Sequence, residues 1–223
     1  MRKALDMFCK AGGATKGLQR AGYAVHGIDI APQPNYCGDD FTQADALTYG
    51  TYEWFQQFDL IWASPPCQAH TTLKVMHNAK EHVDLIPQTR EILRASGRPF
   101  VIENVVGAPL QLPVLLCGSM FNLGVQVYDG WRQLRRHRLF EANFLIERPF
   151  CNHSPGTIGI YGDHARDRRR KAGVHKGIDF PDCDPIAIAS TAMGIAWMNW
   201  KELSQAIPPA YSEYVARQFR KAA

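Results

Sequence analysis

The stretch KALDMFCKAGGATKG, residues 3–17, decides the fold class of this 223-residue chain. It begins with a short, largely apolar run that has the composition of a buried strand. Gly12, Gly13 and Gly17 then mark a turn and the start of a helix. A strand, a glycine-rich turn and a helix in this order are typical of a parallel α/β sheet.

The same alternation continues outward from this unit. Further strands are predicted at residues 24–30, 41–45, 59–63, 100–105 and 139–146, and helices at 14–21, 87–96 and 210–219. The sequence therefore predicts an α/β fold with a mostly parallel sheet and helices on both faces. We expect a core over residues 1–149, a small basic insertion over 150–187, and a C-terminal segment over 188–223 that packs back on the core.

Composition limits the class of protein. With 46% apolar and 21% charged residues, the chain has the profile of an ordinary globular domain and not of a disordered one. Residues 104–128 carry no charge, but glycines and prolines interrupt them, so no transmembrane helix is predicted. The first residues lack the apolar core of a secretory signal, which favours the cytoplasm of a bacterial or phage-infected cell. Six scattered cysteines without a Cys-x-x-Cys pair are expected to be thiols.

Positive charge is concentrated in one part of the chain. Residues 131–176 hold eleven Lys and Arg against four acids, a net +7, so the remainder of this +4 chain carries −3. A basic segment on a slightly acidic domain suits a polyanionic partner such as a nucleic acid. A solvated loop with several arginines is the alternative.

Two loops at strand ends contain candidate functional residues. Gly12 and Gly13 form a turn after the first strand, and Asp29 ends the next strand. This arrangement suits a nucleoside cofactor whose ribose Asp29 would bind. The alternative is a tight turn without a ligand. Cys67 follows Ser64-Pro65-Pro66 at the end of another strand, where it is either a nucleophile or a small buried side chain.

Glu103 and two arginines extend this edge. Glu103 closes the neighbouring strand, where a buried carboxyl group would have a raised pKa and would be able to protonate a base ring; the alternative is a capping role. Arg136 and Arg138 lie two residues apart on an extended segment and suit a phosphate or a base carbonyl.

In this order the motifs resemble those of the cytosine carbon-5 DNA methyltransferases, in particular the short, phage-type members. The resemblance covers residues 3–142 and resumes from residue 192. It departs from the family pattern at Lys10, where a small residue is usual, at Leu134 in place of Gln, and over 205–211, which lack the cofactor-side Asn. The motifs are Asp6-x-Phe8-Cys9-x-Ala11-Gly12-Gly13, Asp29, Asp45, Pro65-Pro66-Cys67-Gln68, Glu103-Asn104-Val105 and Arg136-x-Arg138.

The resemblance implies a Rossmann-like methyltransferase fold, S-adenosylmethionine as cofactor and double-stranded DNA as partner, with no membrane and no obligate protein partner. Cys67 would add to carbon 6 of a flipped-out cytosine, Glu103 would bind ring nitrogen 3, and carbon 5 would then take the methyl group. Arg138 would hold the cytosine carbonyl, Arg136 would support the Cys67 loop, and Gln68 would contact the nucleic acid. The implied cofactor-binding residues are Phe8, Cys9, Ala11, Gly12, Gly13, Asp29, Ile30, Asp45, Ala46 and Pro65.

The insertion lies where longer relatives carry a target-recognition domain, and it is too short for a separate module. Its consecutive cations, Arg168, Arg169, Arg170 and Lys171, are expected to contact phosphates without reading the base sequence. Cys151 and His153, with His164, His175 and Cys183, match no common zinc spacing, so no metal is predicted.

Three other functions compete with DNA methylation. The same catalytic plan is used on transfer RNA, and the short insertion keeps that alternative open. A non-catalytic nucleic-acid or cofactor binder is disfavoured because Cys67, Glu103 and Arg138 are all present. A nicotinamide-dependent oxidoreductase is disfavoured because the glycine spacing differs from Gly-x-Gly-x-x-Gly.

Overall fold

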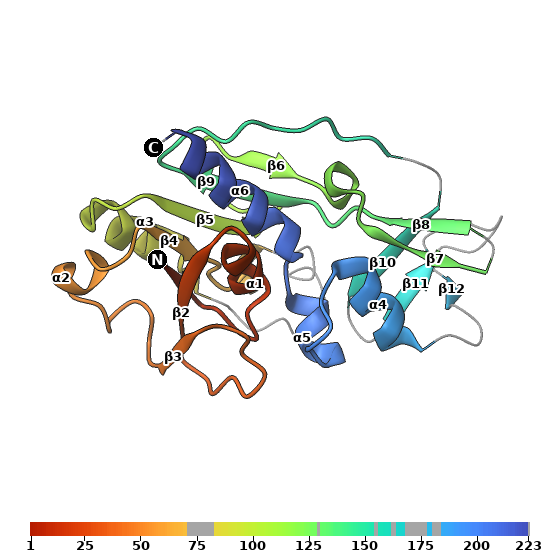
Figure 1. Cartoon of the computed structure of the whole chain (residues 1–223), viewed down its shortest axis with the longest axis horizontal. Helices are drawn as coiled ribbons and strands as arrows, with labels where there is room; N and C mark the ends of the chain where they lie inside the picture. Colours follow the sequence, from red (N-terminus) through yellow and green to blue (C-terminus); the bar gives the residue numbers. More distant parts are fainter. Residues whose placement is uncertain are drawn as a thin grey trace.

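The computed structural model describes residues 1–70, 83–128, 130–153, 156–161, 164–167, 178–179 and 184–222. These residues form two sheets with helices packed on them, and Figure 1 shows the larger sheet with the N-terminus and the smaller one on the opposite side of the molecule.

In the described part of the chain, the larger sheet has seven strands in the order β3-β2-β1-β4-β5-β9-β6. The strands from β3 to β5 are parallel, β9 runs antiparallel to β5, and β6 runs antiparallel to β9. The predicted mostly parallel sheet is confirmed. Its strands are β1 (Arg2–Met7), β2 (Tyr23–Asp29), β3 (Asp40–Gln43), β4 (Leu60–Ala63), β5 (Phe100–Val105), β6 (Val114–Leu116) and β9 (Arg138–Ala142).

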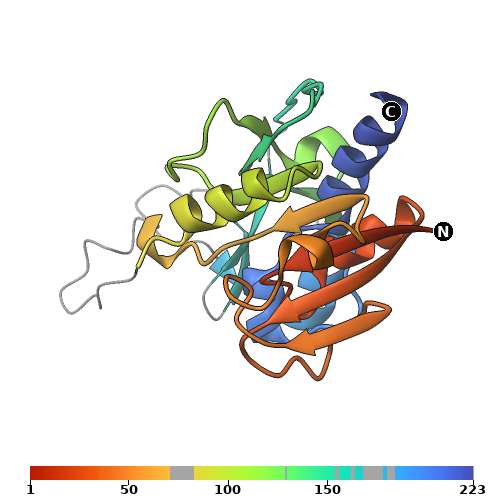
Figure 2. The ribbon, with the colours of Figure 1, turned by 90° about the vertical axis from the view of Figure 1, so that its left-hand side faces the viewer.

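Helices cover both faces of this sheet, as Figure 2 shows from the side. Because successive residues of a strand point to opposite faces, Leu60 packs in the core with α1 and α6, and Ile61 packs in the core with α2 and α3. Strands buried on both faces are nearly continuous apolar runs, as in β4. These helices are α1 (Gly13–Arg20), α2 (Tyr52–Phe55), α3 (Ile86–Ala95) and α6 (Pro209–Ala222).

The smaller sheet begins earlier in the sequence than the expected insertion at 150–187. Its described strands have the order β12-β11-β10-β8-β7, and two of them, β7 and β8, come from the expected core segment 1–149. Helices α4 and α5 close a second apolar core against this sheet. The elements are β7 (Gly124–Val127), β8 (Gly130–Leu134), β10 (Thr157–Tyr161), β11 (His164–Asp167), β12 (Ile178–Asp179), α4 (Pro185–Met193) and α5 (Trp200–Gln205).

Two strands end earlier than predicted, each at a polar side chain that bonds to the backbone. The strand expected over 139–146 ends at Ala142, because the Asn143 side chain accepts from Phe100 N (2.9 Å) and donates to Arg98 O (3.0 Å). The strand expected over 41–45 ends at Gln43, since Asp45 Oδ1 accepts from Leu47 N (2.9 Å) in a turn.

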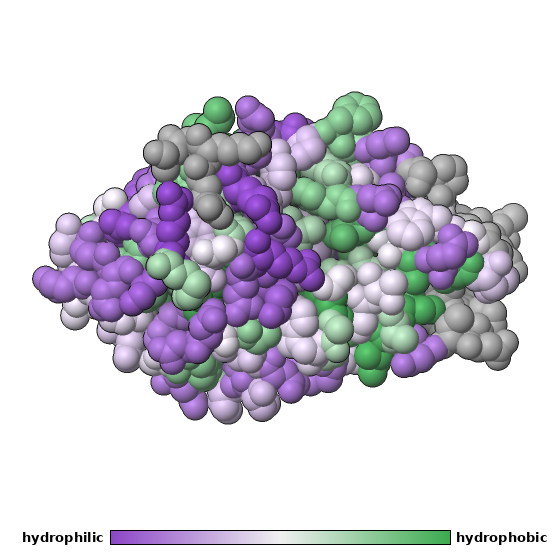
Figure 3. Space-filling view, viewed as in Figure 1, coloured by the Kyte–Doolittle hydropathy of each residue, from purple (hydrophilic) through white to green (hydrophobic). Residues whose placement is uncertain are grey.

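The surface is polar over much of the face seen in Figure 1. Hydrophilic side chains cover most of the left and centre in Figure 3, and hydrophobic side chains gather to the right, in the region of α4. Among the helices of the described residues, none combines the length and the apolar character needed to cross a membrane.

Candidate active site

A cavity of about 450 Å³ lies at the edge of the larger sheet where the parallel strands end. Open α/β sheets bind ligands at this edge, and small-molecule sites typically measure about 300–1,000 Å³. Nine of the predicted site residues line it: Phe8, Cys9, Ala11, Gly13, Pro65, Cys67, Gln68, Glu103 and Arg138. We therefore take this cavity as the candidate active site.

The loop after β4 presents Cys67 to the cavity. Asn104 Nδ2 donates to the Pro65 carbonyl (2.9 Å), which ties this loop to the end of β5. The Cys67 carbonyl accepts from His70 N (2.8 Å) in the short 3₁₀ turn Gln68–His70. Cys9 also lines the cavity, but it is 6% exposed and burial raises the pKa of its thiol well above the usual range. Of these two cysteines, Cys67 is the more accessible.

Glu103 and Arg138 form an ion pair across β5 and β9. Arg138 Nε lies 3.1 Å from Glu103 Oε1, and Glu103 is buried. Burial raises the pKa of Glu103, although the charge of Arg138 and a hydrogen bond from Ser64 oppose this rise. The carboxyl group therefore keeps its proton to a higher pH than an exposed glutamate, which suits it to donate to a ligand.

Arg136 has partners other than the predicted Cys67 loop. Its Nη1 donates to the Ile160 carbonyl (2.8 Å) and its Nη2 to the Ser204 carbonyl (2.7 Å). Ser204 is in the last turn of α5, whose carbonyls have no partner within the helix. Arg136 thus joins β10 to α5, and its backbone is in the left-handed region at φ 25°. Burial lowers the pKa of Arg136 to about 9.

The turn after β1 is unusual in conformation. Phe8 and Lys10 have φ values of 60° and 47°. Residues other than glycine rarely adopt such values, and those that do are enriched at functional sites. Gly12 has φ 85° and comes within close packing distance of Cys37, since a Cβ there would lie 2.7 Å from Cys37 Sγ. Gly12 therefore has a packing role besides any role in binding a ligand.

Four predicted cofactor residues lie at or just after the ends of β2 and β3, beyond the lining of this cavity. Asp29 ends β2 as predicted and accepts hydrogen bonds from Lys10 N and Ala31 N, both 3.1 Å. Ile30 is 72% exposed, Asp45 is exposed and Ala46 is buried. Asp29 is connected to the cavity through Lys10, which lines it.

Asp6 lines the cavity and was absent from the predicted site residues. Its Oδ2 accepts a hydrogen bond from Thr15 Oγ1 (2.6 Å), while its Oδ1 is buried without a partner in the described part of the chain. Burial raises the pKa of Asp6 to about 7. Its sequence signals are the motif Asp6-x-Phe8 and its position inside a strand, which equally suits a buried structural acid.

Replacing Asp6 with Asn is expected to stabilise the protein more as the pH rises. A raised pKa means that the folded state binds the proton more tightly, so this group's contribution to folding weakens between its ordinary pKa of 3.8 and about 7. Asp6→Asn cannot ionise, and above pH 7 its advantage approaches roughly 4 kcal/mol. Urea unfolding at pH 5 and pH 8 measures this. The control is Asp39→Asn, at an exposed position. Because the pKa of Asp39 is lowered, the change in the free energy of unfolding caused by this substitution should be the same at pH 5 and pH 8. If Asp6→Asn also changed the free energy of unfolding by the same amount at both pH values, the raised pKa would be contradicted.

The C-terminal wall of the cavity contains none of the predicted site residues, although residues 205–211 were expected on the cofactor side. It consists of residues around α5, and the Lys10 ammonium donates to the Gln205 side chain there. A Cβ on Gly13 would lie 2.6 Å from the Ile207 carbonyl, so this wall packs directly on the turn after β1. The wall residues are Met198, Glu202, Ser204, Gln205, Ala206 and Ile207.

The predicted phosphate-binding residues, Arg168, Arg169, Arg170 and Lys171, lie outside the described residues.

Comparison with known proteins identifies the fold. No protein-family model and no curated protein matches the chain. An E. coli prophage protein assigned as a DNA modification methyltransferase has a TM-score of 0.64 at 12% identity, over 99% of both chains. The S. pombe Dnmt2 methyltransferase has a TM-score of 0.60 at 15% identity, and the Entamoeba histolytica methyltransferase EhMeth has a TM-score of 0.57 at 10% identity. Each of these two matches covers 100% of this chain and 99% of the other chain. The chain therefore has the Rossmann-like fold of these methyltransferases, as its sequence predicts.

Proposed function

We propose that this chain is a methyltransferase that transfers a methyl group from S-adenosylmethionine to carbon 5 of cytosine in DNA. The observation that supports this best is that Cys67, Glu103 and Arg138 line one cavity together with the turn after β1. The fold shared with three methyltransferases agrees with it.

The residues around the cavity fit the cofactor. S-adenosylmethionine would supply a methyl group made electrophilic by its sulfonium. Its amino-acid end carries an ammonium and a carboxylate. Facing them, the cavity offers the carboxyl group of Asp6, one oxygen of which has no partner among the described residues, and the ammonium of Lys10. Phe8, Cys9, Ala11, Gly13 and Pro65 would surround this end. Its adenosine would extend toward Asp29, Ile30, Asp45 and Ala46 at the ends of β2 and β3.

The catalytic side would activate cytosine through this chain's own groups. The Cys67 thiolate would add to carbon 6, and the electron pair released to carbon 5 would form the bond to the methyl group, whose bond to sulfur breaks so that S-adenosylhomocysteine leaves. Glu103, hydrogen-bonded to ring nitrogen 3, stabilises the negative charge that develops in the ring, and Arg138 binds the carbonyl oxygen. Water would then take up the carbon-5 hydrogen as a proton, and the electron pair of that bond would restore the ring double bond and expel the Cys67 thiolate.

A cytosine within a duplex is inaccessible to such a cavity, so the base must leave the stack. Gln68 is exposed at the rim of the cavity and would contact the nucleic acid there. The +7 charge of residues 131–176, which include Arg168–Lys171, would bind phosphates.

Transfer of a tritiated methyl group to unmethylated duplex DNA and, separately, to folded RNA tests the proposal. We expect label in DNA. Label in RNA alone would show that RNA and not DNA is the substrate, with the proposed chemistry unchanged. Label in neither nucleic acid would contradict the proposed function.

Replacing Asp29 with Ala is expected to weaken S-adenosylmethionine binding about 10- to 100-fold, because two hydrogen bonds to the ribose are lost. Calorimetric titration measures the affinity. Asp29→Asn keeps the side chain's shape beside Lys10 N and should also bind more weakly. The control is Asp39→Ala, which removes another carboxylate that accepts a backbone N–H (Val25 N, 2.8 Å). Normal affinity in both Asp29 variants would exclude a ribose contact.

A further inference from the structure

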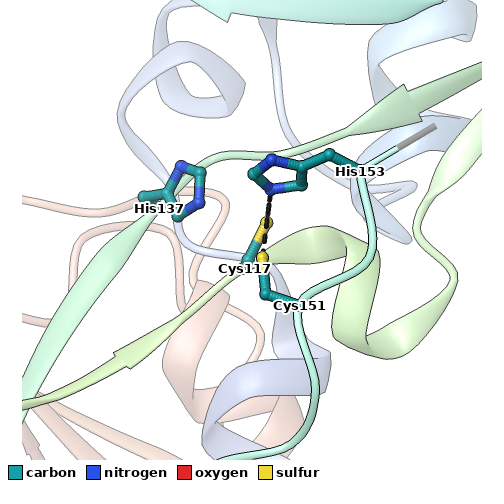
Figure 4. Close-up of side chains that lie close together, drawn as sticks. All are labelled: Cys117, His137, Cys151 and His153. Carbon is teal, nitrogen blue, oxygen red and sulfur yellow. Dashed lines mark hydrogen bonds between the residues drawn. The ribbon is translucent and has the colours of Figure 1, made fainter. Parts of the chain in front are cut away.

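Four potential metal ligands converge away from the cavity, from three separate segments. Cys117 follows β6, His137 precedes β9, and Cys151 and His153 lie on the segment that follows β9. One ligand atom from each of the four lies within 4.8 Å of all the others. Figure 4 shows the two sulfur atoms beneath the His153 ring, with the His137 ring beside it.

From this geometry we propose that Cys117, His137, Cys151 and His153 form a structural zinc site. Two thiolates and two imidazoles are a common ligand set for Zn²⁺, and they balance its charge. Four protein ligands leave no open position, so the role is structural and not catalytic.

The distances agree with a tetrahedral ion. In a tetrahedral zinc site, bond lengths of about 2.0–2.3 Å place neighbouring ligand atoms roughly 3.3–3.8 Å apart. His153 Nε2 lies 3.4 Å from Cys117 Sγ and 3.0 Å from Cys151 Sγ. The two rings are 5.2 Å apart between centroids and inclined at 75°. One of these separations is shorter than the tetrahedral range, and the four atoms lie within 4.8 Å of one another, so small shifts of the side chains would let them share one ion.

Surrounding groups also suit a metal. Ser119 Oγ lies 3.2 Å from Cys117 Sγ, to which it donates, and 3.4 Å from Cys151 Sγ, an arrangement like the hydrogen bonds that orient metal ligands elsewhere. Cys117 is fully buried, so a thiolate there needs a compensating positive charge. Both cysteines are free thiols in the structure and are not joined to each other.

The position of the site suggests what it stabilises. His137 lies between Arg136, which joins β10 to α5, and Arg138, which pairs with Glu103. An ion bound to His137, Cys151 and His153 would fasten the segment leading to the smaller sheet against the edge of the larger one. The metal would thereby hold the Arg136–Arg138 segment in place.

Metal analysis of the untagged full chain, purified under reducing conditions without chelator, tests the site. We expect one zinc per chain by mass spectrometry, and a Tm at least about 5 °C lower after chelation. His153→Ala and Cys151→Ser should weaken zinc affinity at least about 100-fold. His153 is exposed, so its loss leaves the core intact. The control is Cys37→Ser, a half-buried cysteine outside the cluster, which should keep its zinc.

A second measurement does not depend on the metal acquired during expression. Cobalt added to the metal-free chain should give the visible absorption of a tetrahedral dithiolate site, and His153→Ala should abolish it. The absence of zinc together with a failure of the reduced chain to bind cobalt would overturn the proposal. Full zinc content in both His153→Ala and Cys151→Ser, or a Cys117–Cys151 disulfide in the isolated protein, would also overturn it.

Discussion

Replacing Cys67 with Ala is expected to reduce methyl transfer by at least about 10⁴-fold, because no other described residue lining the cavity offers an accessible thiol for the covalent bond to carbon 6. Cys9, the other cysteine there, is buried and its pKa is raised. Cys67 itself is partly exposed, so the variant should keep its free energy of unfolding within about 0.5 kcal/mol.

A duplex containing 5-fluorocytosine measures the bond directly. Fluorine in place of the carbon-5 hydrogen prevents the final proton loss, so the protein should remain attached to the DNA after denaturation. Cys67→Ala should give no such complex, whereas Cys37→Ala, which changes a cysteine outside the cavity lining, should give as much as the unchanged protein. Trapping by Cys67→Ala would assign the nucleophile to another residue.

Replacing Arg90 with Met is expected to destabilise the fold by about 3–5 kcal/mol, the largest loss of stability that we predict. Arg90, on α3, forms a bidentate pair with Glu141 on β9, with distances of 2.7 Å and 2.8 Å. Both side chains are almost completely buried, and Glu141 also accepts from Gln111 N (2.8 Å). Without Arg90 the carboxylate would remain buried and unpaired.

Thermal and urea unfolding of Arg90→Met measure this loss, with a Tm decrease of roughly 10 °C. The control is Arg217→Ala, which breaks an exposed ion pair with Glu213 and should cost no more than about 0.5 kcal/mol. Replacing both members with Met and Leu should recover much of the loss, because no charge is then left unpaired. A change below about 1 kcal/mol for Arg90→Met would show that the pair is not needed.

The parallel half of the larger sheet could be predicted from the sequence because its signals are local. Each strand is a short apolar run ended by a turn, and parallel strands bring their carboxyl ends to one edge. Cys67, in the loop after β4, and Glu103, near the end of β5, could therefore be placed together without knowledge of the side-chain contacts.

Features that depend on pairing between distant segments were not predictable in this way. Arg136 bonds to Ile160 and Ser204, which no motif connects to it. The smaller sheet combines strands on both sides of β9, so the boundary at residue 150 does not follow its architecture. Cys151 and His153 matched no zinc spacing because the other two residues of the cluster lie before β9 in the sequence.

Analysis of the nucleosides in DNA treated with the purified chain and S-adenosylmethionine tests the central claim most directly. Duplex DNA from a host without methyltransferases, digested and examined by mass spectrometry, should contain 5-methyl-2′-deoxycytidine, and DNA treated with Cys67→Ala should not. A methyl group on an exocyclic nitrogen of cytosine or adenine, or methylated DNA from Cys67→Ala, would contradict the proposed chemistry.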